Sequence, residues 1–153
     1  LARLVNSEIT ALRELVSMLR TGGTQGDNAL VPALRRLVRR FSQLFGIEVQ
    51  LDCPATLNTS RALAGTLFQM LNEALNNVRK HTGARRVWIR LAHQEAALHL
   101  HIRDNAGSIL GRRLPDFVPA TLAERVADLG GTLDIGHADG LDTELHITVP
   151  DRP

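Results

Sequence analysis

Residues 69–84 read Gln-Met-Leu-Asn-Glu-Ala-Leu-Asn-Asn-Val-Arg-Lys-His-Thr-Gly-Ala, and this stretch decides how the chain is expected to fold. Apolar residues recur in it and just before it at helical spacing, about 100° per residue. They are Leu63, Leu67, Leu71, Ala74, Leu75 and Val78. Glu73, Asn77 and Lys80 stand at i, i+4 and i+7 and form a polar stripe beside the apolar face. The stretch predicts an amphipathic helix whose polar stripe is either a solvated surface or part of a site.

Five segments outside this helix predict the strands of a sheet, because apolar and polar residues alternate along them. They span residues 47–53, 86–92, 96–103, 132–136 and 143–149. With helices before, within and after these strands, the order favours a two-layer α/β sandwich. Its sheet is expected to be mixed and mostly antiparallel, with five strands and the helices on one face.

Two further helices are expected within the domain. The first spans residues 31–45, with Pro32 tolerated in its first turn, and the second spans residues 121–129. Residues 105–119 are punctuated by Gly and Pro, which predicts a loop between the sheet and the last helix.

Residues 1–20 predict a helix that precedes the domain. Its apolar residues follow the 4-3-4-3 spacing of a coiled-coil seam; they are Val5, Ile9, Leu12, Val16 and Leu19. We interpret this helix as the C-terminal helix of a dimerising bundle; the alternative is a helix packed on its own domain. Residues 21–28 contain three glycines and no apolar residue, which predicts a linker. The domain itself then spans residues 29–153.

Composition and charge limit the classes of protein to which the chain can belong. The net charge is only +2, and aromatic residues make up 3% of the chain with no Tyr, so stacking platforms for bases are scarce. Direct binding of nucleic acid is therefore not expected. The single cysteine, Cys53, allows no intramolecular disulfide and fits a reducing, cytoplasmic setting. No apolar run approaches the roughly 20 residues of a membrane span, so a membrane contact is expected only through upstream segments.

Residues 73–82, Glu-Ala-Leu-Asn-Asn-Val-Arg-Lys-His-Thr, resemble the N-box of sensor histidine kinases. The likeness is greatest to the nitrate-sensor-like class, where Glu-Ala-Leu-x-Asn-x-x-Lys-His-Ala is usual. It implies the ATP-binding fold shared with gyrase, a heat-shock chaperone family and mismatch-repair ATPases. It also implies that Asn77 binds Mg²⁺, a hard cation that suits a carboxamide oxygen. Glu73 is then the candidate general base or water-positioning carboxylate, and Lys80 and His81 are the basic pair near the phosphates.

Residues 102–108, Ile-Arg-Asp-Asn-Ala-Gly-Ser, resemble the family's Asp-Asn-Gly-x-Gly box. Asp104 matches the residue that accepts a hydrogen bond from the adenine amino group. Ala106 and Ser108 replace both glycines, and a side chain forced into a left-handed conformation costs roughly 1–2 kcal/mol. Gly107, one residue out of register, is expected to compensate in part and to contribute to the nucleotide site.

The glycine loop of the third box is missing. Residues 122–131 match the family's helix Met-Arg-Glu-Arg-Val-x-x-Leu-Gly-Gly, but the preceding residues 116–121, Asp-Phe-Val-Pro-Ala-Thr, contain no glycine. In the family this loop offers N–H groups to phosphate oxygens. Pro119 has no N–H to offer, and Asp116 is expected to bring negative charge towards the phosphates.

The last box is altered at one position. Residues 138–143 resemble the family's Pro-Gly-x-Gly-Thr turn and retain Gly140 and Thr143, which the resemblance assigns to the nucleotide site. Asp142 stands where the second glycine belongs.

The resemblance implies the second helix of the dimerisation and phosphoacceptor bundle followed by the ATP-binding catalytic domain. Such a domain is an ATP:protein-histidine phosphotransferase, and it transfers the γ-phosphate of Mg-ATP to a His. No His precedes His81, so the acceptor belongs to a segment absent here. The partners implied are a second copy, bound through residues 1–20, and a response regulator. Because the glycine boxes are eroded, the alternative is a degenerate module that signals by dimerisation and regulator docking, with weak or no ATP binding.

A separate pattern concerns the histidines. His99 and His101 share one face of a predicted strand and have the spacing to chelate a metal with His146 or Asp104. The alternative is that they are ordinary surface or strand histidines.

Overall fold

The computed structural model describes residues 26–151. The helix expected over residues 1–20, its dimer seam and residues 21–25 of the expected linker lie outside the described residues. The elements are α2 (Gly26–Phe45), β1 (Glu48–Asp52), α3 (Arg61–His81), β2 (Arg86–Gln94), β3 (Ala97–Asp104), α4 (Ala106–Leu110), α5 (Ala120–Asp128), β4 (Thr132–Ala138) and β5 (Asp142–Pro150).

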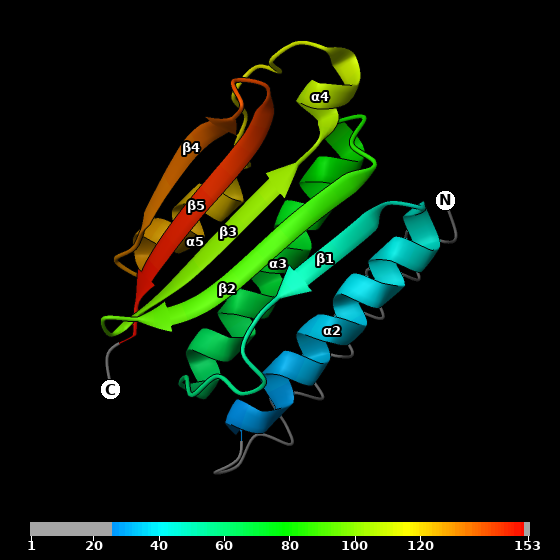
Figure 1. Cartoon of the computed structure of the whole chain (residues 1–153). Coiled ribbons are helices and arrows are strands. Elements are labelled where there is room, and N and C mark those ends of the chain that lie inside the picture. Colours follow the sequence, from blue (N-terminus) through cyan, green and yellow to red (C-terminus); the bar gives the residue numbers. More distant parts are fainter. Residues whose placement is uncertain (1–25, 152–153) are drawn as a thin grey trace.

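The five strands form one mixed sheet in the order β1-β2-β3-β5-β4. β1 pairs with β2 in parallel, and the other three pairings are antiparallel. Figure 1 shows α3 and α5 behind the sheet and no helix over the face turned to the viewer, which we call the open face. The expected two-layer α/β sandwich, with a mostly antiparallel sheet and helices on one face, is confirmed.

The alternation along the strands explains the two layers. In β2, Val87, Ile89 and Leu91 are buried against the helices, whereas Trp88 and Arg90 between them lie on the open face. β3 alternates in the same way. Each strand therefore contributes one apolar row to the core and one polar row to the open face.

The central helix α3 forms because its ends are capped and one face is apolar. The Ser60 hydroxyl accepts a hydrogen bond from the Leu63 N–H at 3.1 Å, which satisfies one free donor of the first turn. At the other end the N–H and hydroxyl of Thr82 both donate to the Val78 carbonyl. Ten of its residues are buried, and this face fixes how the polar stripe is presented.

The helix α2 begins earlier than the sequence predicted. It starts at Gly26, so residues 26–28 of the expected linker are helical and Pro32 lies inside the helix rather than in its first turn. An interior proline costs about 3 kcal/mol because it removes a hydrogen bond. Burial of Leu30 and Val31 at the start of the apolar stripe offsets that cost. The helix packs against α3 and β1.

The hairpin turns use left-handed backbone. Glu95 and Ala96 join β2 to β3 with φ of 52° and 57°, and Asp139 and Gly140 join β4 to β5 with φ of 51° and 71°. Two consecutive positive φ values are typical of the type I′ turn, whose twist suits a hairpin.

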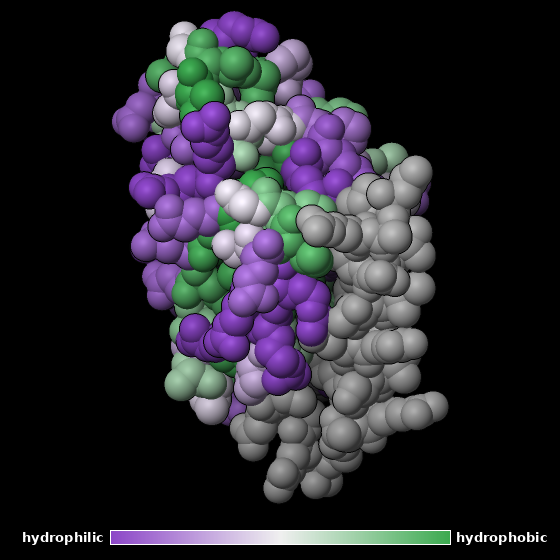
Figure 2. Space-filling model, turned by 90° about the vertical axis from the view of Figure 1, so that its right-hand side faces the viewer, coloured by the Kyte–Doolittle hydropathy of each residue, from purple (hydrophilic) through white to green (hydrophobic). Residues whose placement is uncertain are grey.

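The short helix α4 lies within the segment expected to be a loop, residues 105–119. Its Ile109 and Leu110 are 46% and 49% exposed. Figure 2 shows hydrophobic surface at the same end of the molecule. Among the described residues no helix is both long enough and apolar enough to span a membrane.

Candidate functional site

Two adjoining cavities lie beside α3, where its polar stripe faces residues 114–119. The first has a volume of ≈ 250 Å³, is mostly apolar and reaches the ends of β3 and β5; its lining includes Asn77, His81, Asp104, Leu114, Phe117 and Thr143. The second has a volume of ≈ 340 Å³ and is more polar; its lining includes Glu73, Asn76, Asn77, Lys80, His81 and Pro119. Asn77, His81 and Phe117 line both. The structure thus brings together six of the eight site residues expected from the sequence.

Asn77 stands at the junction of the two cavities. Its Oδ1 is buried and has no hydrogen-bond partner among the described residues. A buried acceptor left unpaired costs about 1–3 kcal/mol, and nearly all such groups in proteins have a partner. Asn77 lines both cavities, and a carboxamide oxygen suits a hard cation such as Mg²⁺ once the side chain turns it towards the cavity.

Asp104 lines the apolar cavity and is 6% exposed. Burial raises the pKa of its carboxyl above the ordinary value. The Asp142 charge adds to this rise, and the hydrogen bond from the Ala106 N–H opposes it. That bond, 3.0 Å long, uses Oδ1. Oδ2 has no hydrogen-bond partner among the described residues and can accept a hydrogen bond from a ligand, so this part of the cavity suits a group that donates one.

Glu73 is engaged by α5. Its carboxylate accepts a hydrogen bond from the Thr121 hydroxyl and lies 3.5 Å from the Arg125 Nε. Arg125 also donates to the side-chain oxygen of Gln69. The residue expected to act as a base is therefore partly neutralised and holds the start of α5 against α3.

The two basic residues of the stripe differ in their contacts. Lys80 is exposed along the second cavity, where an ammonium group can meet an anion. The ring of His81 packs on Phe117, with centroids 5.1 Å apart. Sequence reasoning missed Phe117, which is 52% exposed. An aromatic residue in a polar, proline-flanked loop was the signal that could have revealed it.

Gly107 and Gly140 lie outside both cavities. A side chain at Gly107 would collide with the Leu141 carbonyl, so this glycine permits α4 to touch the turn before β5. Gly140 occupies the left-handed position of that turn and has open space around it. Their glycine character therefore has a structural cause, and the role in nucleotide binding that the family resemblance implies for them stays a prediction.

Ser108 and Asp142, two of the residues that replace family glycines, bind each other. The N–H and hydroxyl of Ser108 donate to Asp142 Oδ1 at 2.8 and 2.6 Å, and Arg103 donates to Oδ2 at 2.9 Å. Burial by itself would raise the pKa of Asp142, but the hydrogen bonds from Ser108 and Arg103 lower it below the ordinary value. Asp142 is 1% exposed, so these bonds anchor α4 to β5 inside the fold.

One sequence expectation about this region is wrong. Ala106 and Ser108 were expected to be forced towards left-handed backbone, but both are helical residues of α4. The chain avoids the strain by forming a helical turn in place of the glycine loop. Asp116 was expected to bring negative charge towards the phosphates, and this stays a prediction. Its carboxylate lies 2.9 Å from the His137 Nε2 on β4, and the residue lines neither cavity.

Comparison with known proteins identifies the class. No protein-family model matches the chain. Over 147 residues it is 33% identical to the signal transduction histidine-protein kinase/phosphatase UhpB of Salmonella typhimurium, covering 93% of this chain and 28% of that protein. Over 154 residues it is 27% identical to the nitrate/nitrite sensor protein NarX of Escherichia coli, covering 97% and 25%. The chain spans about a quarter of the length of these relatives.

Solved structures share the fold. The histidine kinase domain of the blue-light-activated histidine kinase of Erythrobacter litoralis matches with a TM-score of 0.75 at 19% identity, covering 95% of this chain and 73% of that one. The ATP-binding domain of PrrB from Mycobacterium tuberculosis matches with a TM-score of 0.60 at 20% identity, covering 77% and 90%. The fold is that of histidine kinase ATP-binding domains. The chain belongs to the sensor histidine kinase family, which confirms the resemblance read from residues 73–82.

Proposed function

We propose that this domain binds Mg-ATP and serves as the nucleotide-binding domain of a sensor histidine kinase in two-component signalling. The observation that carries the proposal is Asn77. Its Oδ1 is buried and unpartnered among the described residues, and the residue lines both the polar cavity and the apolar cavity, which Asp104 also lines. A bound cation gives this oxygen the partner that it lacks among the described residues.

The two cavities suit the two ends of a nucleotide. The apolar cavity accommodates a purine, with Asp104 Oδ2 accepting a hydrogen bond from its amino group and Thr143 lining the same space. The polar cavity accommodates phosphates, to which the Lys80 ammonium offers charge and the His81 ring a hydrogen bond. Bound Mg-ATP supplies the phosphoryl group of the proposed reaction. The protein contributes positioning and charge, which carry most of the catalysis in phosphoryl transfer.

A second candidate function is a degenerate module with weak nucleotide binding and little transfer. It is favoured by the state of Glu73, whose carboxylate is occupied by Thr121 and Arg125. It is also favoured by the start of α5, where Pro119 borders the polar cavity and has no N–H to offer a phosphate. In either case the His acceptor, a dimer partner and a response regulator belong to the proposal, as does the nitrate-sensor-like class suggested by the likeness to NarX.

Calorimetric titration with a non-hydrolysable Mg-ATP analogue tests the proposal. We expect binding with a Kd of about 1 mM or tighter, which corresponds to roughly 4 kcal/mol. Asn77→Ala is expected to weaken it at least about tenfold, because the cation loses its protein ligand. Asn58→Ala, an exposed substitution before α3, is the matched control and should leave the Kd unchanged. No heat at several millimolar analogue would sink the nucleotide proposal and leave the degenerate module.

A further inference from the structure

The open face of the sheet carries a cluster of metal-ligating side chains that the nucleotide proposal does not use. His101 on β3 and His146 on β5 are direct cross-strand partners. Glu144 precedes His146 by two residues, so its side chain lies on the same side of the sheet. Side chains paired in this way have Cβ atoms about 4.5–5.5 Å apart, within reach of one shared ion.

The three ligand atoms already lie near the geometry of a metal site. The His101 Nε2 and the His146 Nε2 lie 3.7 and 3.4 Å from the same Glu144 Oε2, and all three atoms are within 4.8 Å of one another. Bonds of about 2.0–2.2 Å to a tetrahedral Zn²⁺ place its ligand atoms about 3.3–3.5 Å apart. Well-formed N–H···O bonds are shorter, at about 2.7–3.2 Å. The two His–Glu separations are therefore close to those between ligands of one ion, and the His146–Glu144 contact is a long hydrogen bond.

His101 offers an unused nitrogen. Its Nε2 is buried and has no hydrogen-bond partner among the described residues. The two imidazole rings are stacked, with centroids 4.3 Å apart and planes inclined by 19°. Because χ2 of an imidazole is a soft torsion, the two rings can turn to direct lone pairs towards an ion beside Glu144.

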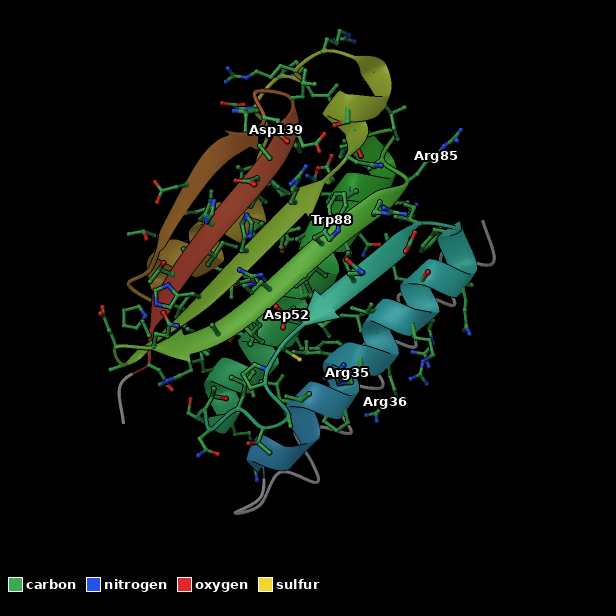
Figure 3. The ribbon with its side chains drawn as sticks, in the orientation of Figure 1. Arg35, Arg36, Asp52, Arg85, Trp88 and Asp139 are labelled. Atoms are coloured by element: carbon green, nitrogen blue, oxygen red, sulfur yellow. The ribbon has the colours of Figure 1, made fainter. Side chains whose placement is uncertain are left out.

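Two arginines on the open face have their own anionic partners. Arg103 lies 2.9 Å from the Asp142 carboxylate and over the Trp88 ring, and Arg90 lies 3.2 Å from that of Asp52. Their charges are thus partly balanced and do not forbid a cation nearby. In Figure 3, the labelled Trp88 and Asp52 show the part of this face that β2 and β1 form.

We infer that His101, His146 and Glu144 form a binding site for Zn²⁺ or a similar divalent first-row ion. Two imidazoles and one carboxylate suit such ions, whereas Mg²⁺ and Ca²⁺ prefer oxygen ligands. Three protein ligands leave a fourth position for water. A cavity of ≈ 290 Å³ lined by Trp88 and Arg90 borders His101 and Glu144 and keeps that position accessible.

The ligand set differs in part from the one expected from the sequence. His101 and His146 are brought together as expected, but Glu144 completes the set. His99 faces the Thr148 hydroxyl, 3.4 Å away. Asp104 pairs across the sheet with the buried Val87 and so lies on the helix-covered side. The metal site and the nucleotide cavities are thus on opposite faces of the sheet.

Titration of the 153-residue chain with Zn²⁺, by calorimetry and by competition with a chromogenic chelator, tests the site. We expect one ion per chain with a Kd of about 10 µM or tighter. His101→Ala and His146→Ala should each weaken binding by about 10–100-fold or more, because removal of a residue that only supports a metal ligand already costs that much. His93→Ala is the matched control, because His93 pairs with Asp151 outside the cluster. It should change the Kd less than about threefold.

Three further measurements check the folding of the variants, the metal ligands and the independence of this site from nucleotide binding. His146 is half exposed, so His146→Ala is expected to fold, and circular dichroism checks this. Co²⁺ should give visible absorption bands in the wild type that His146→Ala abolishes. A wild-type Kd weaker than about 100 µM, or affinity that survives His101→Ala and His146→Ala alike, would overturn the proposal. Equal loss in His99→Ala would overturn the ligand set. Retained binding of the nucleotide analogue in His146→Ala separates this site from the nucleotide proposal.

Discussion

The buried carboxylate of Asp142 should be one of the most sensitive single groups in the domain. Asp142→Ala removes the acceptor for the Ser108 N–H, the Ser108 hydroxyl and the Arg103 guanidinium. A hydrogen bond to a charged group contributes about 1.5–3 kcal/mol, and a buried donor left unpaired costs a similar amount. These bonds share one partly solvated network and do not add fully, so we expect a loss of about 3 kcal/mol.

Urea unfolding at neutral pH, followed by circular dichroism, measures this loss. Ser108→Ala removes only the hydroxyl bond and should cost about 1 kcal/mol. Asp139→Asn is the matched control, because it removes a charge that is 90% exposed and 3.9 Å from Arg103, and Asn tolerates the left-handed backbone of that position. It should cost less than about 0.5 kcal/mol. If Asp142→Ala proved as mild as Asp139→Asn, the claim that this carboxylate anchors α4 to β5 would fail.

The sign of the pH dependence gives a second reading of the same variant. The pKa of Asp142 is lowered in the folded protein, so its stabilisation is present above the unfolded pKa, about 4. It is lost as the pH falls through the folded pKa. The stability difference between wild type and Asp142→Ala should therefore shrink in acid. A difference that stayed constant down to acidic pH would mean that the carboxylate charge is not what anchors the segment.

Three more substitutions test other parts of the structure. Ala96→Gly should raise the free energy of unfolding by about 0.5–1 kcal/mol, because Ala96 has a φ of 57°. The control, Ala97→Gly, changes a strand residue and should lower the free energy of unfolding. A loss of stability in both variants would contradict the left-handed backbone at Ala96. Burial raises the pKa of Asp104 in the folded protein, so the wild type loses stability as the pH rises from the unfolded pKa, about 4, to the folded one. Asp104→Asn should remove this loss and make the free energy of unfolding less dependent on pH above about 4. An unchanged slope of the unfolding free energy against pH, measured by urea unfolding, would argue against it. Phe117→Ala should weaken binding of the nucleotide analogue about fivefold, because lost stacking costs roughly 1 kcal/mol. The free energy of unfolding should not change, since the ring is half exposed. A loss of stability without a loss of affinity would instead assign the ring to the core.

The parts of the fold that could be predicted from the sequence are those whose signal is local. The alternation in residues 86–103 and the period of residues 63–78 are imposed by which face is buried, so strands and helix alike could be read from them. Asn77, Asp104 and the basic pair came from the family resemblance. The structure adds what no motif states, namely that Asn77 lines both cavities while its Oδ1 has no hydrogen-bond partner in the described part of the chain.

What could not be predicted depends on contacts between distant segments. The pairing of Ser108 with Asp142 joins residues 34 positions apart, so each looked like an isolated loss of glycine. The contact of Asp116 with His137 is equally non-local. The early start of α2 depends on burial of Leu30 against the rest of the domain, which outweighs the local signal of Pro32.

The position of Trp88 makes the protein its own spectroscopic reporter. It is the only tryptophan of the chain, and it lies on the open face beside the cavity that borders His101 and Glu144. A paramagnetic ion such as Cu²⁺ bound there should quench its emission. A nucleotide bound across the sheet against α3 has no direct contact with the indole. Emission recorded during sequential addition of the two ligands should therefore distinguish filling of one face from filling of the other in a single cuvette.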